Sequence, residues 1–312
     1  MSEKGIEAVR RRIVGGIAGF EIRKADQWQR WRTGDPPPLG LPPIPAWRDA
    51  APNDSSSADL LPFAPVSFRD FMLYEQHVID ASREMARRYL PRAYRAAAIY
   101  ERLTGTVYPA FKPSQLWYRQ PIYYMGNALT FLPDGSELVA PDYACDLDYE
   151  LELGFVIGRP LRNATEAEAA AAIVGYVVLN DISARNVQLG EMRSGFGPQK
   201  AKHFASSMSS TLIAAQLIPD HTQLSATVYI NGHVVTRSST AGMRHSLAAA
   251  LAHASRGEDL YPGELFGTGT LPGCSGIESG NLLCAGDRLE LEIAGVGSIT
   301  HTIVDHLDRI IR

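Results

Sequence analysis

The chain has 312 residues, of which 45% are hydrophobic and 21% are charged, and its formal net charge is −4. These values are ordinary for a soluble globular protein, and the weak negative charge argues against a surface that binds nucleic acid or an anionic membrane. The thiols of Cys145, Cys274 and Cys284 show no metal-ligand spacing, so a reducing, cytoplasmic location is expected. The longest apolar run, residues 169–179, is shorter than the ~20 residues that a membrane-spanning helix needs.

The N-terminal residues are predicted to form a short segment apart from the main body. Residues 1–34 are expected to hold a short strand and then a polar stretch with tryptophans. The proline-rich sequence DPPPLGLPPIP (35–45) and the polar sequence NDSSSAD (53–59) are typical of linkers and loops. The expected division is therefore 1–60 for this segment and 61–312 for one larger domain.

Helices are predicted from apolar residues at helical spacing and from capping residues. The predicted helices are residues 67–90, about 93–103, 163–175 and 246–255. Ser67 and Asp70 form a loose capping-box pattern at the start of the first helix. Thr165 and Glu168 form a capping box in the third, and Ser246 is expected to cap the fourth.

Most of the chain from Trp117 onward is predicted to form strands. LDYELELGFVIG (147–158) alternates in polarity, and YVVLNDIS (176–183) begins with the unbroken apolar run of a buried strand. Asn231 and Gly232 are expected to form the turn of a hairpin. The expected fold class is therefore α+β, dominated by strands and with few helices.

One stretch of this sequence places several carboxylates together. A strand has a side-chain period of two, so Asp148, Glu150 and Glu152 are expected on one face of the strand. Asp181 follows a buried apolar run, where an ionised carboxylate needs a partner. Such oxygen ligands suit Mg²⁺, Mn²⁺ or Ca²⁺ better than zinc. From these residues alone, an acidic solvent-facing strand and a metal site both remain open.

Several segments, taken in order, resemble the fumarylacetoacetate hydrolase family. The resembling segments are RDFMLYEQH (69–77), PIYYMGN (121–127), LDYELELGFVIG (147–158), GYVVLNDISARNVQ (175–188), GFGPQKAKHF (195–204) and GTGT (267–270). The resemblance covers the chain from about residue 67 to the C-terminus. It implies the mixed β-roll of the family's C-terminal domain, with few helices, and assembly into a homodimer.

The resemblance also implies roles for individual residues. It implies that Mg²⁺ (or Mn²⁺ or Ca²⁺) is held by Asp70, Glu150, Glu152 and Asp181. It implies that His77 is the general base for water and that Lys202 lies near the metal and the developing oxyanion, with the neighbouring Lys200 as an alternative for this role. The residues that it implies for substrate binding are Tyr124, Arg185, Gln188 and Thr270.

The acid that partners the catalytic histidine has no clear match to the long hydrolases of the family. Short members carry a histidine and an acid three residues apart on a lid helix. His77 and Asp80 have this spacing, which would place both on one helix face. Glu264 and Glu278 are further candidate acids near the GTGT segment.

The resemblance implies an enzyme acting on a small 2-oxoacid or β-diketo acid. The expected reaction is hydrolytic cleavage of a carbon–carbon bond in an acylpyruvate-type acid through a metal-bound enolate. The same enolate would serve a decarboxylase of an oxaloacetate-like acid or an isomerase or tautomerase of a 2-hydroxydienoate. A non-catalytic, metal-stabilised relative is the remaining alternative, and the presence of His77, Lys202 and Arg185 argues against it.

Overall fold

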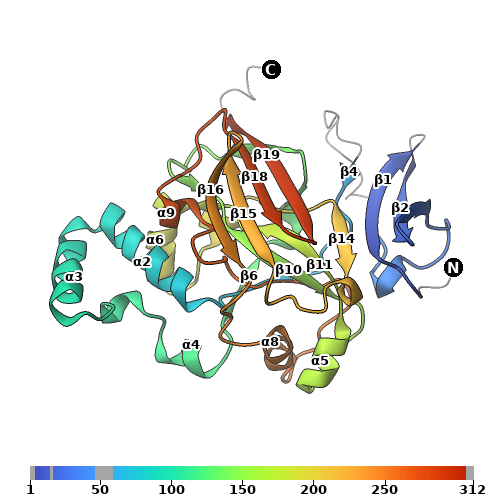
Figure 1. Ribbon diagram of the computed structural model, residues 1–312, viewed down its shortest axis with the longest axis horizontal. Coiled ribbons are helices and arrows are strands. Elements are labelled where there is room, and N and C mark those ends of the chain that lie inside the picture. The colour runs from blue at the N-terminus through green and yellow to red at the C-terminus, as the bar shows by residue number, and fades with distance from the viewer. Residues whose placement is uncertain (1–3, 15–16, 46–58, 307–312) are drawn as a thin grey trace.

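The computed structural model describes residues 4–14, 17–45 and 59–306, and within these ranges the protein is built mainly from two β-sheets (Figure 1). Each sheet is mixed, because β5 pairs with β17, β7 with β13 and β8 with β19 in parallel, whereas the other strand pairs within these two sheets are antiparallel. Short helices lie around the sheets. The strand-dominated α+β class and the mixed β-roll are therefore confirmed.

The larger sheet carries the N-terminal strands at one edge and the central strands in its middle. Its main strand order is β3 (Gln27–Arg30), β2 (Ile17–Lys24), β1 (Ala8–Val14), β14 (Thr211–Ala214), β11 (Ile173–Asn180), β10 (Leu151–Ile157), β17 (Leu265–Gly267), β5 (Phe68–Phe71) and β6 (Tyr123–Gly126). The strands that join it off this path are β4 (Asp59–Leu60), β7 (Phe131–Pro133) and β13 (Ser206–Met208).

The second sheet packs against the middle of the first. Its order is β16 (His233–Ser239), β15 (Ser225–Ile230), β18 (Arg288–Ile293), β19 (Gly297–Asp305) and β8 (Glu137–Ala140), and a separate pair is formed by β9 (Leu147–Asp148) and β12 (Ser183–Ala184). Leu151, Leu153 and Phe155 on one face of β10 share a core cluster with residues of β18 and β19. Val156 on the other face of β10 belongs to a second apolar cluster. The middle strands β10 and β11 are thus buried on both faces.

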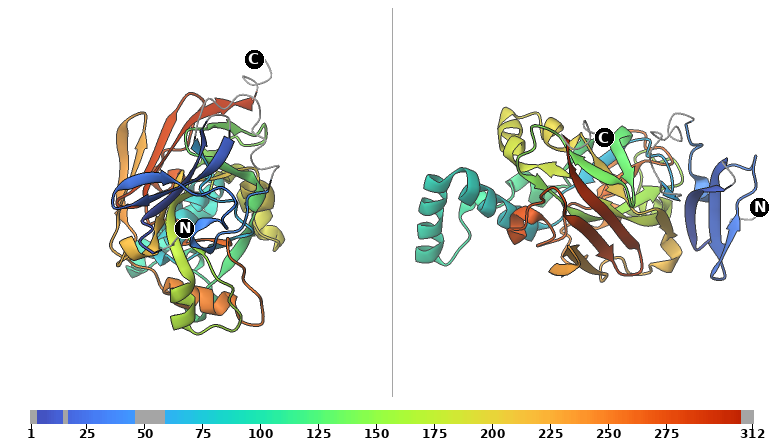
Figure 2. Two further views of the ribbon diagram at one scale, coloured as in Figure 1. Left: turned by 90° about the vertical axis from the view of Figure 1, so that its right-hand side faces the viewer. Right: turned by 90° about the horizontal axis from the view of Figure 1, so that it is seen from above.

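The helices are short, except for a pair that projects from one end of the molecule. The helices are α2 (Glu75–Tyr89), α3 (Pro91–Thr104), α4 (Gln115–Arg119), α5 (Glu166–Ala172), α6 (Arg185–Ser194), α7 (Gln199–Lys202), α8 (Leu247–Ala254) and α9 (Gly276–Ser279), with single 3₁₀ turns at Pro38–Gly40, Pro109–Phe111, Ala128–Thr130 and Ala215–Leu217. In two views α2 and α3 lie at the end opposite strands β1–β3 (Figures 1 and 2). Within the described ranges, no helix has both the length and the apolar character required to cross a membrane.

Local capping and turn signals are confirmed at three places. Thr165 and Glu168 form the reciprocal capping box of α5, and the Ser246 hydroxyl accepts the N–H of Ala249 at the start of α8. Asn231 and Gly232 both adopt positive φ, +53° and +77°, as the turn of the β15–β16 hairpin requires.

The helix predicted over residues 67–90 is wrong in its first part. Residues 68–71 form strand β5 instead, which lies between β17 and β6, and the helix begins only at Glu75. Asp70 therefore belongs to a strand and is no capping residue, because pairing on both edges overrides the local helical pattern. The strand predicted at Trp117 is also wrong, since this residue lies in α4 with its indole N–H bonded to the backbone carbonyl of Met72.

The N-terminal segment holds three antiparallel strands rather than the single predicted strand. The turn between β2 and β3 places Ala25 and Asp26 at positive φ, and the Glu7 carboxylate accepts the N–H groups of both. Strand β1 pairs with β14, so this meander extends the larger sheet. Most of the loop predicted at residues 53–59 lies outside the described residues, and the domain boundary at residue 60 stays a prediction.

Candidate active site

Three carboxylates from three strands of the larger sheet converge in its middle. Asp70 lies in β5, Glu152 lies in β10, and Asp181 directly follows β11. One oxygen of each lies within 4.8 Å of one oxygen of each of the others, and all three residues are buried. The sheet order explains the convergence, because β11, β10, β17 and β5 are consecutive neighbours.

Gly267 makes room for this convergence. It lies in β17, between the strands that carry Asp70 and Glu152. A Cβ atom at this position would lie 2.5 Å from Asp70 Oδ1 and 2.5 Å from Glu152 Oε2. A larger residue would therefore push the two carboxylates out of the space in which they meet.

The three carboxylates lack sufficient hydrogen-bond donors. Asp70 Oδ1, Glu152 Oε1 and Asp181 Oδ1 are buried and find no hydrogen-bond partner among the residues that the structure describes. Burial, and then the charge of Asp181, raise the pKa of Asp70 well above its usual value. Burial, followed by the charges of Asp70 and Asp181, does the same to the pKa of Glu152. The carboxylates repel one another, and some of their oxygens have no hydrogen-bond partner. A set of oxygen ligands without nitrogen or sulfur ligands fits a hard divalent cation.

Lys202 provides one positive charge at this cluster. Its Nζ donates to Glu150 Oε2 at 2.6 Å, to the hydroxyl of Ser183 at 2.9 Å and to Asp181 Oδ2. Burial would lower the pKa of Lys202, but the carboxylates of Asp181 and Glu150 outweigh burial and raise it. Tyr124 donates its hydroxyl to Asp181 Oδ2 at 2.8 Å. The lysine is therefore charged and fixed beside the cluster.

Lys200 and Lys202 were both candidates, and the structure separates them. Lys202 is buried in the cluster, whereas Lys200 is exposed and its Nζ lies over the ring of Tyr143, 5.6 Å from the centroid. The structure therefore brings Lys202, and not Lys200, to the carboxylates.

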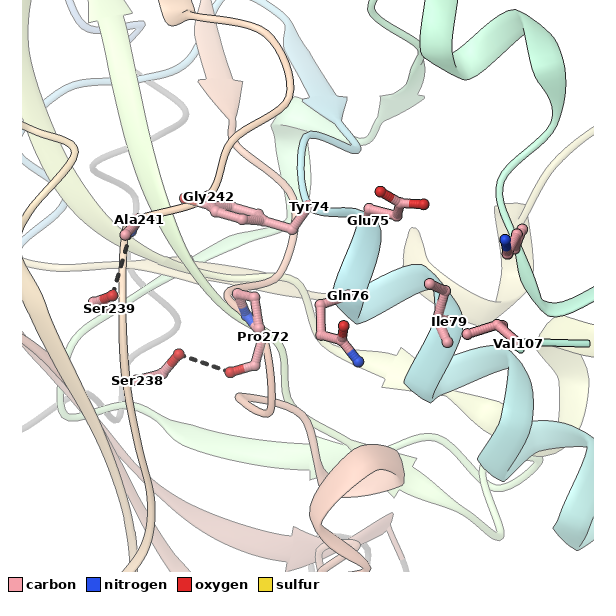
Figure 3. Close-up of a pocket in the computed structure, with 11 residues that line it drawn as sticks. Tyr74, Glu75, Gln76, Ile79, Val107, Ser238, Ser239, Ala241, Gly242 and Pro272 are labelled. Carbon is pink, nitrogen blue, oxygen red and sulfur yellow. Dashed lines mark hydrogen bonds between the residues drawn. The ribbon is translucent and has the colours of Figure 1, made fainter. Parts of the chain in front are cut away.

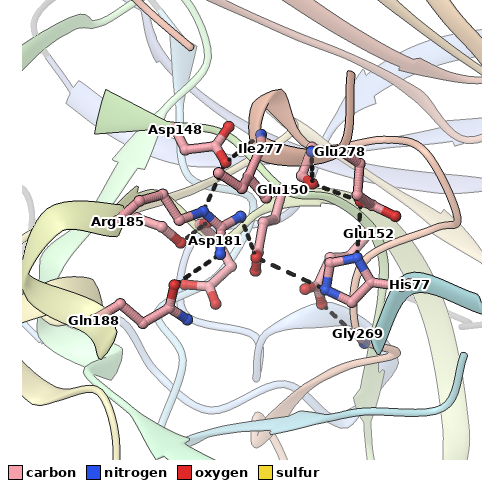
Figure 4. A network of polar contacts seen from close by, with 12 residues as sticks. His77, Asp148, Glu150, Glu152, Asp181, Arg185, Gln188, Gly269, Ile277 and Glu278 are labelled. Carbon is pink, nitrogen blue, oxygen red and sulfur yellow. Dashed lines mark hydrogen bonds and ion pairs between the residues drawn. The ribbon is translucent and has the colours of Figure 1, made fainter. Parts of the chain in front are cut away.

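Arg185 holds Glu150 from the other side. Its guanidinium donates to Glu150 Oε1 at 2.6 Å, to Asp148 Oδ2 at 2.7 Å and to Gln188 Oε1 at 2.9 Å (Figure 4). The pKa of Glu150 is lowered, because Lys202 and Arg185 outweigh the raising effect of burial. The predicted acidic face of residues 148–152 is thus buried, and Asp148 and Glu150 are paired with cations, so the alternative of a solvent-facing strand is wrong.

His77 reaches the site from α2 and is paired with an acid from a distant segment. Its Nδ1 lies 2.8 Å from Glu278 Oε2, and its Nε2 faces Glu150 Oε1 at 4.0 Å (Figure 4). Burial would lower the pKa of His77, but the charge and hydrogen bond of Glu278 raise it. Glu278 also accepts the backbone N–H of Gly273 at 3.0 Å. With Nδ1–H donating to Glu278, Nε2 is the basic nitrogen on the side of the carboxylates.

The partner expected on the same helix lies elsewhere. Asp80 accepts hydrogen bonds from Gln76 and Arg83 and makes none with His77. The i, i+3 spacing of His77 and Asp80 therefore gives an incorrect partner in this structure. Glu264, the other candidate acid, pairs with Arg69 and Ser67 away from the histidine.

The segment that follows β17, residues 268–272, contacts the carboxylate cluster through Gly269 and lines a separate cavity through Pro272. The Gly269 N–H donates to Glu152 Oε2 at 3.1 Å, and Thr270 is buried in the same segment. A cavity of about 620 Å³ lies where Pro272 of this segment meets the first turn of α2 and the chain around Ser238 and Gly242 (Figure 3). None of the clustered carboxylates lines this cavity, so it is distinct from the charged centre.

The chain belongs to the fumarylacetoacetate hydrolase family. Residues 94–304, well over half of the chain, match the family model described as the C-terminal part of fumarylacetoacetate hydrolase. Asp70 and His77 lie upstream of the matched range, and the fold brings them to residues within it.

Curated relatives have several activities. The chain is 30% identical over 194 residues to a homoprotocatechuate catabolism bifunctional isomerase/decarboxylase of Escherichia coli, which covers 62% of this chain and only 42% of that relative. It is 29% identical over 185 residues to a mitochondrial oxaloacetate tautomerase of Homo sapiens, covering 59% of this chain and 81% of the relative. The named relatives are enzymes that act on small organic acids.

Solved structures share the fold. A fumarylacetoacetate hydrolase from Exiguobacterium antarcticum superimposes with a TM-score of 0.69 at 19% identity, covering 96% of this chain and 100% of that one. A fumarylpyruvate hydrolase from Pseudomonas aeruginosa, solved in complex with Mn²⁺ and pyruvate, gives 0.59 at 20% identity, covering 81% and 94%. At these identities the likeness shows the fold alone.

Proposed function

We propose that this protein is a metal-dependent hydrolase that cleaves the carbon–carbon bond of an acylpyruvate or a related β-diketo acid. The observation that carries the proposal is the His77–Glu278 pair, whose free imidazole nitrogen faces the carboxylate cluster at 4.0 Å from Glu150. A histidine held in one tautomer by a buried acid is the arrangement of a general base for water. Decarboxylation and tautomerisation activate no water, although tautomerisation also needs a group that moves a proton.

The cation would be held by Asp70, Glu152 and Asp181, with Glu150 beside them. Mg²⁺ and Mn²⁺ suit these ligands best, and the Mn²⁺ of the Pseudomonas aeruginosa hydrolase supports this choice. When bound, the cation supplies Lewis-acid polarisation of the substrate's oxygens. Because a divalent cation would neutralise charges that Lys202 now shares, the lysine would be free to turn towards substrate.

The residues of this chain would divide the remaining work. Nε2 of His77 takes a proton from water while Glu278 stabilises the imidazolium through Nδ1–H. The hydroxide adds to the acyl carbonyl carbon, and Lys202 donates a hydrogen bond to the oxyanion that forms there. The bond to the methylene carbon then breaks, its electron pair passes to the pyruvate enolate, and a proton completes pyruvate and a carboxylic acid.

Substrate orientation falls to the polar groups that rim the cluster. Arg185 and Gln188 are joined by a hydrogen bond and present a cation and an amide, which suit the carboxylate of a 2-oxoacid. Tyr124 lies on the opposite side, bonded to Asp181, and Thr270 lies in the segment that contacts Glu152 through Gly269. We assign these four residues to substrate binding.

A second function, decarboxylation of an oxaloacetate-like acid or tautomerisation of a 2-hydroxydienoate, is favoured by the curated relatives. The Escherichia coli relative is a bifunctional isomerase/decarboxylase and the human relative is an oxaloacetate tautomerase. The same cation site would stabilise the enolate in both reactions. The two functions therefore differ in whether Glu278 and His77 are needed to activate water.

Three matched variants separate these functions. Glu278→Gln and His77→Gln should each lower hydrolysis of an acylpyruvate panel by ~10²-fold or more, since a general base contributes 10²–10⁴-fold. Asp80→Asn, on the same helix, should change it by less than about threefold, as a surface substitution does. The assay is mass spectrometry of the products with Mg²⁺ or Mn²⁺. Activity on oxaloacetate without any acylpyruvate cleavage would overturn the hydrolase and leave the second function.

Assembly and location are further proposals. We propose a cytoplasmic homodimer, supported by free thiols at Cys145, Cys274 and Cys284 and by the dimers that the family resemblance implies. Light scattering should give twice the mass of one chain at micromolar concentration. A monomer mass would contradict the dimer.

A further inference from the structure

Asp148 lies between two groups of site residues, Arg185 with Glu150 on one side and Glu278 with His77 on the other. Its carboxylate is fully buried and accepts four hydrogen bonds. Oδ1 accepts the backbone N–H groups of Tyr149 at 2.7 Å and Gly276 at 2.6 Å, and Oδ2 accepts the backbone N–H of Ile277 at 2.9 Å and Nε of Arg185 at 2.7 Å. The proposed mechanism gives this residue no part, although it is buried and charged.

On one side Asp148 fixes the guanidinium of Arg185, which holds Glu150 beside the carboxylate cluster. Arg185 has its Nε on Asp148 and its two terminal nitrogens on Glu150 and Gln188. The guanidinium group is planar, so fixing its Nε sets the direction of both terminal nitrogens. The position of Glu150 relative to Arg185 therefore depends on Asp148.

On the other side Asp148 fixes the short turn that carries the histidine's partner. Residues 276 and 277 begin α9, and Glu278 follows directly. The Ser275 hydroxyl accepts the N–H of Glu278 at 3.4 Å and donates to its carboxylate. A Cβ atom on Gly276 would lie 2.4 Å from Asp148 Oδ1, so this contact needs glycine.

We propose that Asp148 is a positioning residue that sets Glu278, and through it His77, relative to Glu150 and the cation site. The two groups come from segments that are far apart in the sequence, and this carboxylate accepts hydrogen bonds from Arg185 in one and from the turn that carries Glu278 in the other. The catalytic consequence rests on the proposed hydrolase function. The placement of His77 by Asp148 is a property of the resting protein and does not depend on the substrate.

Two variants disturb these contacts of Asp148 in different ways. Asp148→Asn keeps the size of the side chain and removes the charge opposite Arg185, which leaves a buried cation with one carboxylate fewer. Gly276→Ala keeps every charge and forces α9 away from Asp148. Matched controls are Asp287→Asn, whose carboxylate accepts the N–H of Cys284 at 2.8 Å and the side-chain amide of Asn231 at 2.8 Å, and Gly190→Ala, where nothing lies within 4 Å of the added carbon.

The first measurement is steady-state hydrolysis of an acylpyruvate by the Mn²⁺-loaded enzyme. Asp148→Asn and Gly276→Ala should each lower kcat by ~10²-fold, the lower end of the contribution of a general base. In a Glu278→Gln background the further loss should be less than about threefold, because residues that act through one another are not additive. Full multiplication of the two losses would overturn the proposal, as would kcat values equal to those of the controls.

The second measurement needs no substrate and separates this proposal from the proposed function. Nitrogen-15 NMR of the His77 imidazole, assigned with His77→Gln, should show Nδ1–H bonded to a carboxylate in the wild type and in both controls. Asp148→Asn and Gly276→Ala should lose that signal. An unchanged signal in a folded variant would overturn the proposal, even if wild-type hydrolysis is confirmed. Should Asp148→Asn not fold, Gly276→Ala decides the outcome alone.

Discussion

The charges on the projecting helices α2 and α3 and those in the centre of the larger sheet use the same residue types in opposite ways. On the helices, Arg83 pairs with Glu101 at 3.0 Å, with side chains 27% and 22% exposed. In the centre, Arg185 pairs with Asp148 at 2.7 Å, with side chains 2% and 0% exposed. The distances are similar, and the difference lies in the access of water.

This difference decides what each set of charges does. An exposed ion pair contributes about 0–1 kcal/mol, because water screens it and ordering the side chains costs entropy. Burying a charge costs several kcal/mol, and pairing offsets this cost only partly. The centre holds five buried carboxylates, Asp70, Asp148, Glu150, Glu152 and Asp181, against the two cations Arg185 and Lys202. Such an excess is unfavourable for folding and is the feature expected of a site that binds a cation.

The largest effect is expected from removing one carboxylate of the cluster. Glu152→Gln should abolish stabilisation by Mn²⁺, because it removes a ligand oxygen and relieves the repulsion that the cation offsets. In the wild type a hundredfold excess of cation over Kd should add about 2.7 kcal/mol to the free energy of unfolding. Thermal unfolding with and without Mn²⁺ measures this difference.

The matched control for this prediction is Glu264→Gln. Glu264 is also buried in the larger sheet, but it pairs with Arg69 and takes no part in the cluster. This variant should keep the Mn²⁺ effect. Equal stabilisation of wild type and Glu152→Gln by the cation would place the cation site elsewhere.

A second variant separates the base from the cation. His77→Ala should lower acylpyruvate hydrolysis by ~10²–10⁴-fold, the range for a general base, because no other imidazole faces Glu150 in the described part of the chain. The Mn²⁺ stabilisation measured by thermal unfolding should remain. Loss of both properties together would mean that His77 supports the cluster rather than activating water.

The pH dependence of the cation-free protein sharpens the comparison further. The pKa values of Asp70 and Glu152 are raised in the folded state, so their neutral forms favour folding. This stability is fully present below their unfolded pKa values and is lost as pH rises through the folded ones, and each tenfold gain in proton affinity on folding corresponds to about 1.4 kcal/mol. Urea unfolding in a chelator should therefore show lower stability at pH 8 than at pH 5.5.

The raised pKa of His77 acts in the same direction, so a control is needed. Glu152→Gln removes the contribution of Glu152 and keeps those of Asp70 and the histidine, so it should reduce the decline. A decline of equal size in this variant would show that Glu152 does not contribute to the pH dependence. Rising stability from pH 5.5 to pH 8 in the wild type would contradict the raised carboxylate pKa values.

The smallest effect is expected on the projecting helices. Glu101→Gln removes the charge that pairs with Arg83 and should change the free energy of unfolding by less than about 1 kcal/mol. Hydrolysis should be unchanged. If Glu101→Gln changed the free energy of unfolding or the rate of hydrolysis as much as Glu152→Gln does, the distinction between the two regions would be wrong.

Features set by neighbouring residues could be predicted from the sequence. The capping box of Thr165 and Glu168 and the turn at Asn231 depend on contacts within a few residues. The acidic residues at 148, 150 and 152 marked a place that the structure shows to be buried and charged. Of the four metal ligands that the family resemblance implies, the structure clusters Asp70, Glu152 and Asp181. The fourth, Glu150, is paired with Arg185 and Lys202.

Features set by distant pairing could not be predicted. Residues 68–71 carry a helical pattern, yet β17 and β6 pair with them on both sides. Glu278 is separated from His77 by 201 residues, so no local spacing connects them, whereas Asp80 has the expected spacing and the wrong neighbours. The signals near this acid were its proximity to the GTGT segment, which made Glu278 one of two further candidates, and the helix cap at Ser275.

The claim that the charged centre activates water against a carbonyl is tested most directly with isotopically labelled water. An acylpyruvate is incubated with the Mn²⁺-loaded protein in H₂¹⁸O, and the products are examined by mass spectrometry. Cleavage by His77-activated water predicts one ¹⁸O in the carboxylic acid that derives from the acyl group, and formation of this product slowed by ~10²-fold or more with Glu278→Gln. Turnover that releases carbon dioxide or a tautomer, with no labelled acid, would contradict the claim.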